Sequence, residues 1–434
     1  MGQLQPNVLN SALPGAPTFL KAPSDTPLSE DSGLTAAVRE IIADVRQNGD
    51  AALRRMTQKF DGVALDNFIV SSDEIEAARR RLDDSLLRDL EFGVERITAF
   101  ARLQRQALTA VEAEVLPGVH IGHRLIPVRR VGAYVPGGRY PLLSSAQMAI
   151  IPAKVAGVDE IHVCTPPKVH PAVLYAAHRS GATRIYRVGG AQGIAALAFG
   201  TATIPAVDKI CGPGNKYVNE AKRQVLGFVG IDQLAGPSEI FIIADKTGDP
   251  RIIAADLLGQ AEHDVDTRVG LITDDADLAR AAMTEIKRQL PLLSTVDVAR
   301  VAWERRGEVA LCPDLDACIA YSDHVGPEHL QVHTADPTAI GERLRNYGSL
   351  FIGVEASVVY SDKIVGTNHI LPTGAAARYT GGVWVGTFLK VCTHQRLTNR
   401  GVEVIAPIAA RQSAREGLDG HRKAAAIRLD PAVV

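Results

Sequence analysis

Apolar residues recur at helical spacing over two long stretches near the start of the chain. The first covers residues 32–60 and the second covers about 72–107. Residues three and four positions apart share one face of a helix, so this spacing predicts amphipathic helices. Residues 1–31 are instead rich in Pro, Ser, Gly and Leu without a clear period, which predicts an extended N-terminal arm.

From residue 129 onward, short apolar runs alternate with helical stretches. Strands are predicted after residue 129 and at 160–164, 184–188, 207–211, 239–244, 268–273, 308–312 and 348–353. Helices are predicted between them at 145–156, 172–180, 192–199, 216–226, 251–262, 277–288 and 315–322. This alternation predicts an α/β protein with two successive units, each a parallel sheet covered by helices on both faces.

The alternation of strands and helices ends near residue 355. Residues 355–390 are irregular and rich in Gly, Thr, Val and Tyr, and a run of this length without regular structure is usually functional. Residues 400–428 then show helical spacing again, and we expect two helices broken near Gly417 or Gly420.

Composition narrows the class of protein. The 434 residues are 46% hydrophobic and carry a net charge of −2 with mixed signs, so we expect two or three domains and no nucleic-acid partner. No apolar run approaches the roughly 18 residues of a membrane span, and no signal peptide is evident. Five scattered cysteines without a Cys-x-x-Cys motif predict a cytoplasmic protein whose metal ligands, if any, are His, carboxylate and amide groups.

Gln260 and His263 lie one turn apart at the end of a predicted helix. They therefore share a face that offers an amide oxygen and an imidazole, which is half of a plausible metal site. A polar helix end that faces solvent is the alternative interpretation.

Glu328 and His329 form a second polar cluster, in which an adjacent carboxylate and imidazole provide two proton acceptors at one point. A surface turn is the alternative. Two further polar clusters are Asp362 to His369 and Glu416 to His421. Each of them, taken alone, is a combination of residues that is common in surface loops.

Three residues close to Gly-rich turns are candidates for binding a dinucleotide. Tyr134, Gln192 and Asn215 each follow a strand of the same predicted sheet, and ligands of such sheets bind beyond the carboxyl ends of the strands. The turn at Gly189 is not the Gly-x-Gly-x-x-Gly fingerprint, so simple strand-to-helix packing is the other interpretation.

Seven motifs in order along the chain resemble the histidinol dehydrogenase family, from about residue 32 to the C-terminus. They are Tyr134-Val-Pro-Gly-Gly, Gly189-Gly-Ala-Gln-Gly-Ile-Ala-Ala-Leu-Ala, Gly212-Pro-Gly-Asn-Lys-Tyr-Val, Ala235-Gly-Pro-Ser-Glu-Ile, Gln260-Ala-Glu-His, Pro327-Glu-His-Leu and Gly366-Thr-Asn-His-Ile-Leu-Pro-Thr.

The resemblance implies a homodimer that uses zinc and NAD to oxidise a primary alcohol through an aldehyde to a carboxylic acid. It implies two Rossmann-like domains of incomplete dinucleotide-binding type. The division would be an arm at 1–31, a zinc and substrate domain at 32–133 and 240–384, an NAD domain at 134–239, and a helical dimerisation segment at 385–434.

The resemblance also implies roles for individual residues. Zinc would be held by Gln260, His263, Asp362 and His421, the last reaching across from the partner subunit. His329 would act as base toward the alcohol, and Glu328 would activate the water that attacks the aldehyde. NAD would lie near Tyr134, Gln192 and Asn215. Substrate would contact the zinc ligands and Ser238, His329, His369 and Glu416. Arg139, a departure from the family pattern, is a further candidate for contacting the substrate.

The sequence departs from the family pattern around the expected substrate. Arg139 stands where small residues are common, Val358 and Gln331 replace glutamates, and residues 379–390 differ and end in a lysine. Lost carboxylates and a gained cation favour an anionic substrate. The pattern resembles the sulfopropanediol 3-dehydrogenase paralogues, which oxidise 2,3-dihydroxypropane-1-sulfonate to sulfolactate.

Three alternatives stay open on the sequence. Histidinol itself is the other substrate considered. A binding or scaffold protein would be expected to lack the catalytic groups, and a metallohydrolase would not need the paired NAD-type turns.

Overall fold

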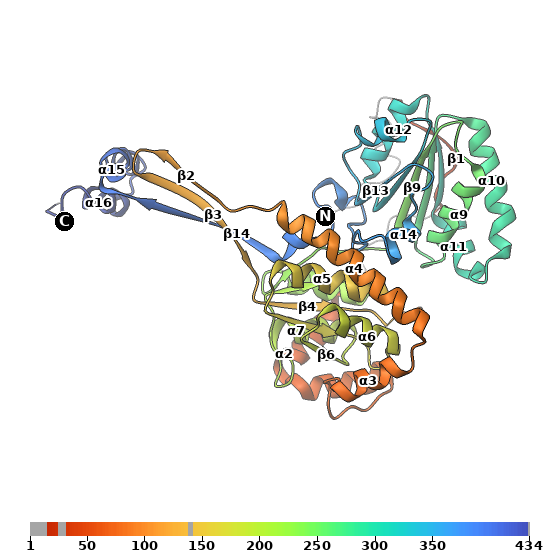
Figure 1. Ribbon diagram of the computed structural model, residues 1–434, viewed down its shortest axis with the longest axis horizontal. Helices are drawn as coiled ribbons and strands as arrows, with labels where there is room; N and C mark the ends of the chain where they lie inside the picture. Colours follow the sequence, from red (N-terminus) through yellow and green to blue (C-terminus); the bar gives the residue numbers. More distant parts are fainter. Residues whose placement is uncertain (1–14, 25–31, 138–141, 433–434) are drawn as a thin grey trace.

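Two parallel β-sheets form the body of the protein in the computed structural model, which describes residues 15–24, 32–137 and 142–432 (Figure 1). Arg139 lies outside the described residues. The first sheet has the order β6-β5-β4-β7-β8, with strands β4 (Arg130–Tyr134), β5 (Glu160–Cys164), β6 (Arg184–Tyr186), β7 (Lys209–Cys211) and β8 (Gly230–Ile231).

The second sheet has the order β1-β11-β10-β9-β12-β13. Its strands are β1 (Thr18–Lys21), β9 (Glu239–Ala244), β10 (Arg268–Thr273), β11 (Gly307–Leu311), β12 (His329–His333) and β13 (Ser349–Ile352). Only β1 is antiparallel, and it adds part of the predicted N-terminal arm to the edge of the sheet. In both sheets the parallel strands follow the order third, second, first, fourth, fifth along the chain. The predicted α/β class with parallel sheets is confirmed.

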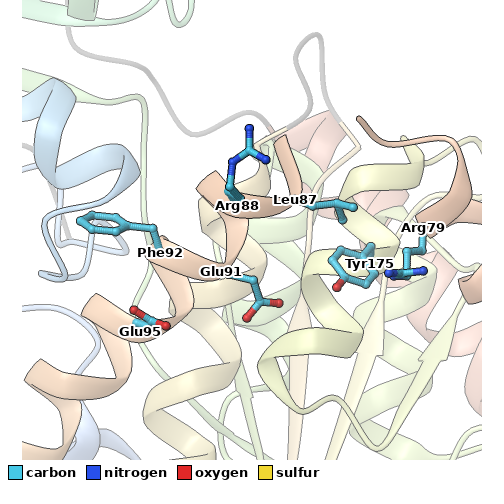
Figure 2. A pocket seen from close by; sticks show the side chains of 7 residues that line it. All are labelled: Arg79, Leu87, Arg88, Glu91, Phe92, Glu95 and Tyr175. Atoms are coloured by element: carbon cyan, nitrogen blue, oxygen red, sulfur yellow. The ribbon is translucent and has the colours of Figure 1, made fainter. Parts of the chain in front are cut away.

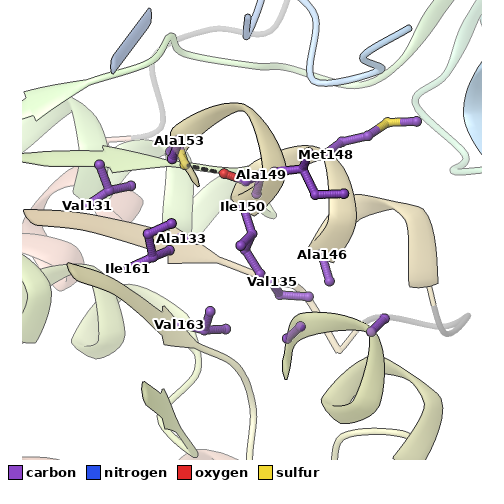
Figure 3. Packing of buried hydrophobic residues seen from close by; sticks show 14 of the residues in the cluster. Val131, Ala133, Val135, Ala146, Met148, Ala149, Ile150, Ala153, Ile161 and Val163 are labelled. Atoms are coloured by element: carbon purple, nitrogen blue, oxygen red, sulfur yellow. Dashed lines mark hydrogen bonds between the residues drawn. The ribbon is translucent and has the colours of Figure 1, made fainter. Parts of the chain in front are cut away.

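Helices cover both faces of the first sheet. One face packs against α4 (Asp84–Gln106), α5 (Leu143–Ala156) and α6 (Pro171–Ser180). Figure 3 shows strand residues of this core, such as Val131 and Ala133, together with helix residues such as Met148 and Ile150. The other face packs against α2 (Ser32–Asp61), α7 (Gly190–Phe199) and α8 (Lys216–Val225). The short α3 (Ser72–Arg80) packs on α6.

This packing differs from the expected grouping of residues 32–133 with the second sheet. The apolar stripe of α2, including Val38, Val45 and Leu53, is buried against α7 and α8, and Ile97 of α4 is buried against α5. The helices of residues 32–106 therefore belong to the first unit.

The second sheet is also covered on both faces. Helices α9 (Pro250–Ala261), α10 (Ala276–Gln289) and α11 (Val296–Arg306) share one core with α14 (Val358–Lys363). Helices α12 (Leu315–Val325) and α13 (Pro337–Gly341) cover the other face and form a second core with it. Beyond α14, residues 370–388 include two 3₁₀ helices, η2 (Ala376–Arg378) and η3 (Val385–Phe388), and bury Ile370 and Phe388 in the core of the first unit. The irregular segment thus joins the two units.

A narrow arm projects from this body (Figure 1). It is an antiparallel sheet of β2 (Val111–Leu116), β3 (Val119–Pro127) and β14 (Leu389–Leu397), and it carries α15 (Asn399–Arg415) and α16 (Asp419–Ala426) at its tip. The two C-terminal helices match the predicted pair. Among the described helices, none combines the length and apolar character that a membrane crossing requires.

Candidate active site

The expected catalytic residues, together with His263 and Asp362 of the expected metal ligands, lie where the two units meet. Glu239 is the first residue of β9 and His329 the first of β12, so this is the amino edge of the second sheet. Ser145, which follows β4 at the carboxyl edge of the first sheet, lies with its Oγ 3.0 Å from Nε2 of His369. Opposite edges of the two sheets therefore face one site.

Glu328 and His329 are held by the main chain of Glu239. The Glu239 N–H donates to Oε2 of Glu328 at 2.8 Å, and the Glu239 carbonyl accepts from Nδ1 of His329 at 2.8 Å. A carbonyl only accepts, so the proton of a neutral His329 resides on Nδ1 and Nε2 keeps its lone pair. Nε2 is buried and has no hydrogen-bond partner among the described residues.

The charges around His329 favour its protonated form. Burial opposes the imidazolium, but the carboxylates of Glu328 and Asp362 outweigh it and raise the pKa of His329 to about 9. Glu328 Oε2 lies 3.4 Å from Nδ1. The imidazole is thus a base that binds a proton strongly.

Glu239 was not among the residues singled out from the sequence, although it lies in one of the quoted motifs. Burial raises the pKa of its side chain to about 7, with Arg268 opposing and Glu328 adding to the rise. Its Oε1 accepts from Gly374 N–H at 3.3 Å. Glu239 is a positioning residue, because it fixes both Glu328 and His329 through its backbone.

Two of the four expected zinc ligands, His263 and Asp362, come together, and a third, Gln260, lies one turn before His263. Gln260 is buried at the end of α9, and Nε2 of His263 lies 3.8 Å from Oδ2 of Asp362. His369 lies on the other oxygen of Asp362, at 3.5 Å from Nδ1 to Oδ1. Burial opposes ionisation of Asp362, but His369, His329 and His263 outweigh it and hold the pKa of this carboxyl well below its usual range.

The fourth expected ligand lies elsewhere. His421 is exposed on α16, and Glu416, an expected substrate residue, is exposed at the end of α15, both at the tip of the projecting arm (Figure 1). Within residues 15–24, 32–137 and 142–432, no three His, Cys, Asp or Glu side chains form a metal-binding group. The set of one amide, one imidazole and one ionised carboxylate fits three positions of a zinc site and leaves one for an outside ligand.

The expected dinucleotide residues line the carboxyl edge of the first sheet. The Tyr134 hydroxyl accepts from Gly190 N–H at 3.0 Å, and burial raises its pKa to about 12. Gln192 is buried in α7. The Asn215 side-chain oxygen accepts from Tyr217 N–H and Val218 N–H and so caps the start of α8.

A buried ion pair that was not foreseen fixes the turn before Asn215. Lys222 and Asp232 are 2.5 Å apart and almost fully enclosed; Lys222 donates to the Gly212 carbonyl, and Asp232 accepts from Gly212 N–H. Gly212 has φ +116°, and an added Cβ would lie 2.1 Å from the Tyr134 carbonyl oxygen. Only glycine allows this approach.

The hollow in Figure 2 is a different feature. It has a volume of about 380 Å³ and lies on the outer surface of the first unit. None of the expected site residues is among those that line it: Arg79, Leu87, Arg88, Glu91, Phe92, Glu95 and Tyr175.

Comparison with known proteins decides the family. The family model described as histidinol dehydrogenase matches residues 25–429. The chain belongs to the histidinol dehydrogenase family. It is therefore an NAD-dependent dehydrogenase that acts on the CH–OH group of an alcohol, in a family that converts alcohols to acids by four-electron oxidation.

Individual relatives cover nearly the whole chain. A sulfopropanediol 3-dehydrogenase from Ruegeria pomeroyi is 44% identical over 95% of this chain and 96% of its own length. A histidinol dehydrogenase from Agrobacterium fabrum is 44% identical over 93% of this chain and 94% of its own length. The crystal structure of histidinol dehydrogenase from Elizabethkingia anophelis, 36% identical, superposes with a TM-score of 0.89 over 95% of each chain.

Within this histidinol dehydrogenase fold, two of the substituted positions do not line the substrate space as expected. Gln331 is fully buried and donates to Asp256 and to the Ala356 carbonyl, on the side of β12 that faces α9. Val358 is buried in the core of the second unit, in one cluster with Phe351. Lys390 lies on β14 in the arm. Ser238 directly precedes Glu239 at the site.

Proposed function

We propose that this enzyme oxidises a primary alcohol to a carboxylic acid through an aldehyde, with zinc and two molecules of NAD per turnover. The observation that carries the proposal is the buried, unpartnered Nε2 of His329 with its tautomer fixed by the Glu239 carbonyl. Gln260, His263 and Asp362 would hold the zinc, and Tyr134, Gln192 and Asn215 would hold the dinucleotide.

The protein's own part in the reaction is positioning and proton transfer. The nicotinamide, when bound, accepts a hydride in each oxidation, and zinc, when bound, orients and polarises the substrate hydroxyl. His329 accepts the hydroxyl proton at Nε2 in the first oxidation. Glu328, held by Glu239 N–H beside His329, accepts a proton from the water that adds to the aldehyde, and the resulting hydrate is then oxidised.

We propose that the working unit is a homodimer with shared active sites. His421 and Glu416 lie on the arm, away from the other site residues of the same chain. The arm also exposes apolar side chains, including Val391 at 65% and Val115 at 51%. A second copy would cover these side chains and supply the fourth ligand, in line with the symmetric pairing common among enzymes.

For the substrate, we propose a small anionic diol such as 2,3-dihydroxypropane-1-sulfonate. The support is the relative from Ruegeria pomeroyi, which is named sulfopropanediol 3-dehydrogenase and is 44% identical over 95% of this chain. Histidinol is the second candidate, because the relatives named for the two substrates are equally similar to this chain.

Steady-state kinetics test the proposal. With the sulfonated diol we expect two NADH per alcohol consumed and a higher kcat/KM than with histidinol. Turnover of histidinol alone would refute the anionic substrate, and a single NADH per alcohol would refute the four-electron course.

A further inference from the structure

Three elements that carry site residues also carry polar residues farther from the site. On α9, Asp256 and Gln260 are four residues apart and so share one helix face, and His263 follows just beyond the helix, where its N–H donates to the Gln260 carbonyl. On β12, His329, Gln331 and His333 alternate and share one face of the strand. Both faces are directed into the core that α9 shares with the second sheet. Ile240 and Ile242 belong to this core, and they are the β9 residues paired with His329 and Gln331, so they lie on the same face of the sheet.

Asp256 joins these elements. Its Oδ1 accepts from the Ser357 hydroxyl at 2.9 Å, and its Oδ2 accepts from Nε2 of Gln331 at 3.2 Å. Ser357 is the N-cap of α14, where its Oγ accepts from Val359 N–H. Gln331 also donates to the Ala356 carbonyl at 3.3 Å. One carboxylate therefore ties α9, β12 and the start of α14 together.

The consequence lies at the other end of the same helices. Gln260 follows Asp256 by about one turn on α9, and His263 lies just beyond the end of that helix; Asp362 lies in α14, after its N-cap Ser357. The separation of His263 from Asp362, 3.8 Å, depends on how α9 and α14 are placed against each other. Short helices transmit a shift at one end to the other, because their backbones are rigid.

We propose that Asp256 is a positioning residue that sets the geometry of the zinc site by locking α14 to α9. This inference rests on the proposed function, because it takes zinc as the ion held by Gln260, His263 and Asp362. Residues that orient ligands from behind typically change metal affinity about 10- to 100-fold when they are replaced. Gln331 fits this role, since its amide donates to Asp256, whereas a glutamate there would oppose a second carboxylate.

The test measures zinc affinity of the full-length protein rather than its activity. Metal-free wild type, Asp256→Asn and Ser357→Ala are titrated with zinc against a chromophoric chelator, and the melting temperature of each is recorded with and without zinc. We expect Asp256→Asn to weaken zinc binding about 10- to 100-fold and Ser357→Ala to weaken it less, with a smaller rise in melting temperature on adding zinc.

Asp323→Asn is the matched control, because Asp323 accepts from Arg345 N–H and Asn346 N–H in the same unit without contacting α9 or α14. It should lower the stability of the metal-free protein without changing zinc affinity. A zinc affinity of Asp256→Asn within twofold of wild type would overturn the inference. Wild type that binds no zinc would instead overturn the proposed metal centre.

Discussion

The main-chain carbonyl of Glu239 accepts a hydrogen bond from Nδ1 of His329 at 2.8 Å and so leaves Nε2 as the ring nitrogen that can accept a proton. The residue that fixes this tautomer is a strand neighbour from β9, ninety positions earlier in the chain. It also holds Glu328 by its N–H, and the two proton acceptors are placed by a single peptide segment.

Replacing the base should remove most of the activity without unfolding the protein. We expect His329→Gln to lower kcat by about 10²- to 10⁴-fold, the usual contribution of a general base. His162→Gln is the control, because His162 is also a buried strand histidine but lies in β5 of the first sheet. The rate of NADH formation gives kcat for both variants. If His329→Gln keeps the wild-type kcat, His329 is not the base.

The rate of the first oxidation should rise with pH up to about 9. Below the pKa of His329, about 9, the imidazole is protonated and cannot accept the hydroxyl proton. The first NADH formed in a single turnover measures this step. Glu328→Gln should move the apparent pKa to lower pH, because the carboxylate no longer favours the imidazolium; an unmoved profile would contradict this coupling.

The same raised pKa has a consequence for stability. The folded-state pKa of about 9 exceeds the ordinary value of 6.5, so protonated His329 contributes its full stabilisation below pH 6.5. That contribution is lost as the pH rises from 6.5 through 9. Urea unfolding of the metal-free protein between pH 6.5 and 9 measures this effect. The free energy of unfolding should fall with rising pH in wild type and fall less in His329→Gln.

Two inactive variants should restore activity when mixed. A dimer of one His329→Gln chain and one His421→Ala chain contains one site with both histidines intact. Refolding or co-expressing equal amounts should recover roughly a quarter of wild-type activity, since half of the dimers are mixed and each has one working site. No recovery, in mixtures shown to exchange subunits, would argue that each site is built within one chain.

Breaking the ion pair behind the Gly212 turn should destabilise the first unit. Lys222→Met leaves the enclosed Asp232 charge without its partner and should cost about 3–5 kcal/mol. The KM for NAD should also rise, because the turn leads to Asn215. Adding Asp232→Asn should regain part of the stability, since the Asn oxygen can still accept from Gly212 N–H; urea unfolding and NAD titration measure both effects.

The regular α/β part of the fold could be predicted because its strands are apolar and bounded by turns. Residues 239–244 and 268–273 were predicted with the same bounds as β9 and β10. The helical block at 72–107 is in fact two helices, and the signal for the break was present: Asp83 caps α4 by accepting from Ser85 N–H and Leu86 N–H.

Strand β12 was missed for a functional reason. His329, Gln331 and His333 alternate with apolar residues as in a strand, but here the polar set faces the core. Such a pattern is rare because buried polar groups need partners. Here His329 bonds to the Glu239 carbonyl on β9 and Gln331 bonds to Asp256 on α9, both far away in the sequence. For the same reason Gln331 was expected at the substrate, whereas it bonds to Asp256.

The three strands of the arm were missed because both faces of this ribbon are largely exposed. Residues of β2 are exposed throughout, so burial imposes no alternation on them. The placement of Glu416 and His421 could not follow from pattern at all, since it depends on where the arm is directed.

The two sheets share one strand order but present opposite edges to the site, the first its carboxyl edge and the second its amino edge. The loops that would hold the cofactor and the segments that carry the chemistry therefore come from different ends of two similar units. Variation in the segments before β10, β12 and β13 can change what is oxidised while the turns after β4, β6 and β7 stay intact. A mutational library restricted to the former segments, with His263 and Glu328 kept, should yield new specificities without a loss of dinucleotide affinity, which makes this architecture a natural starting point for diversification.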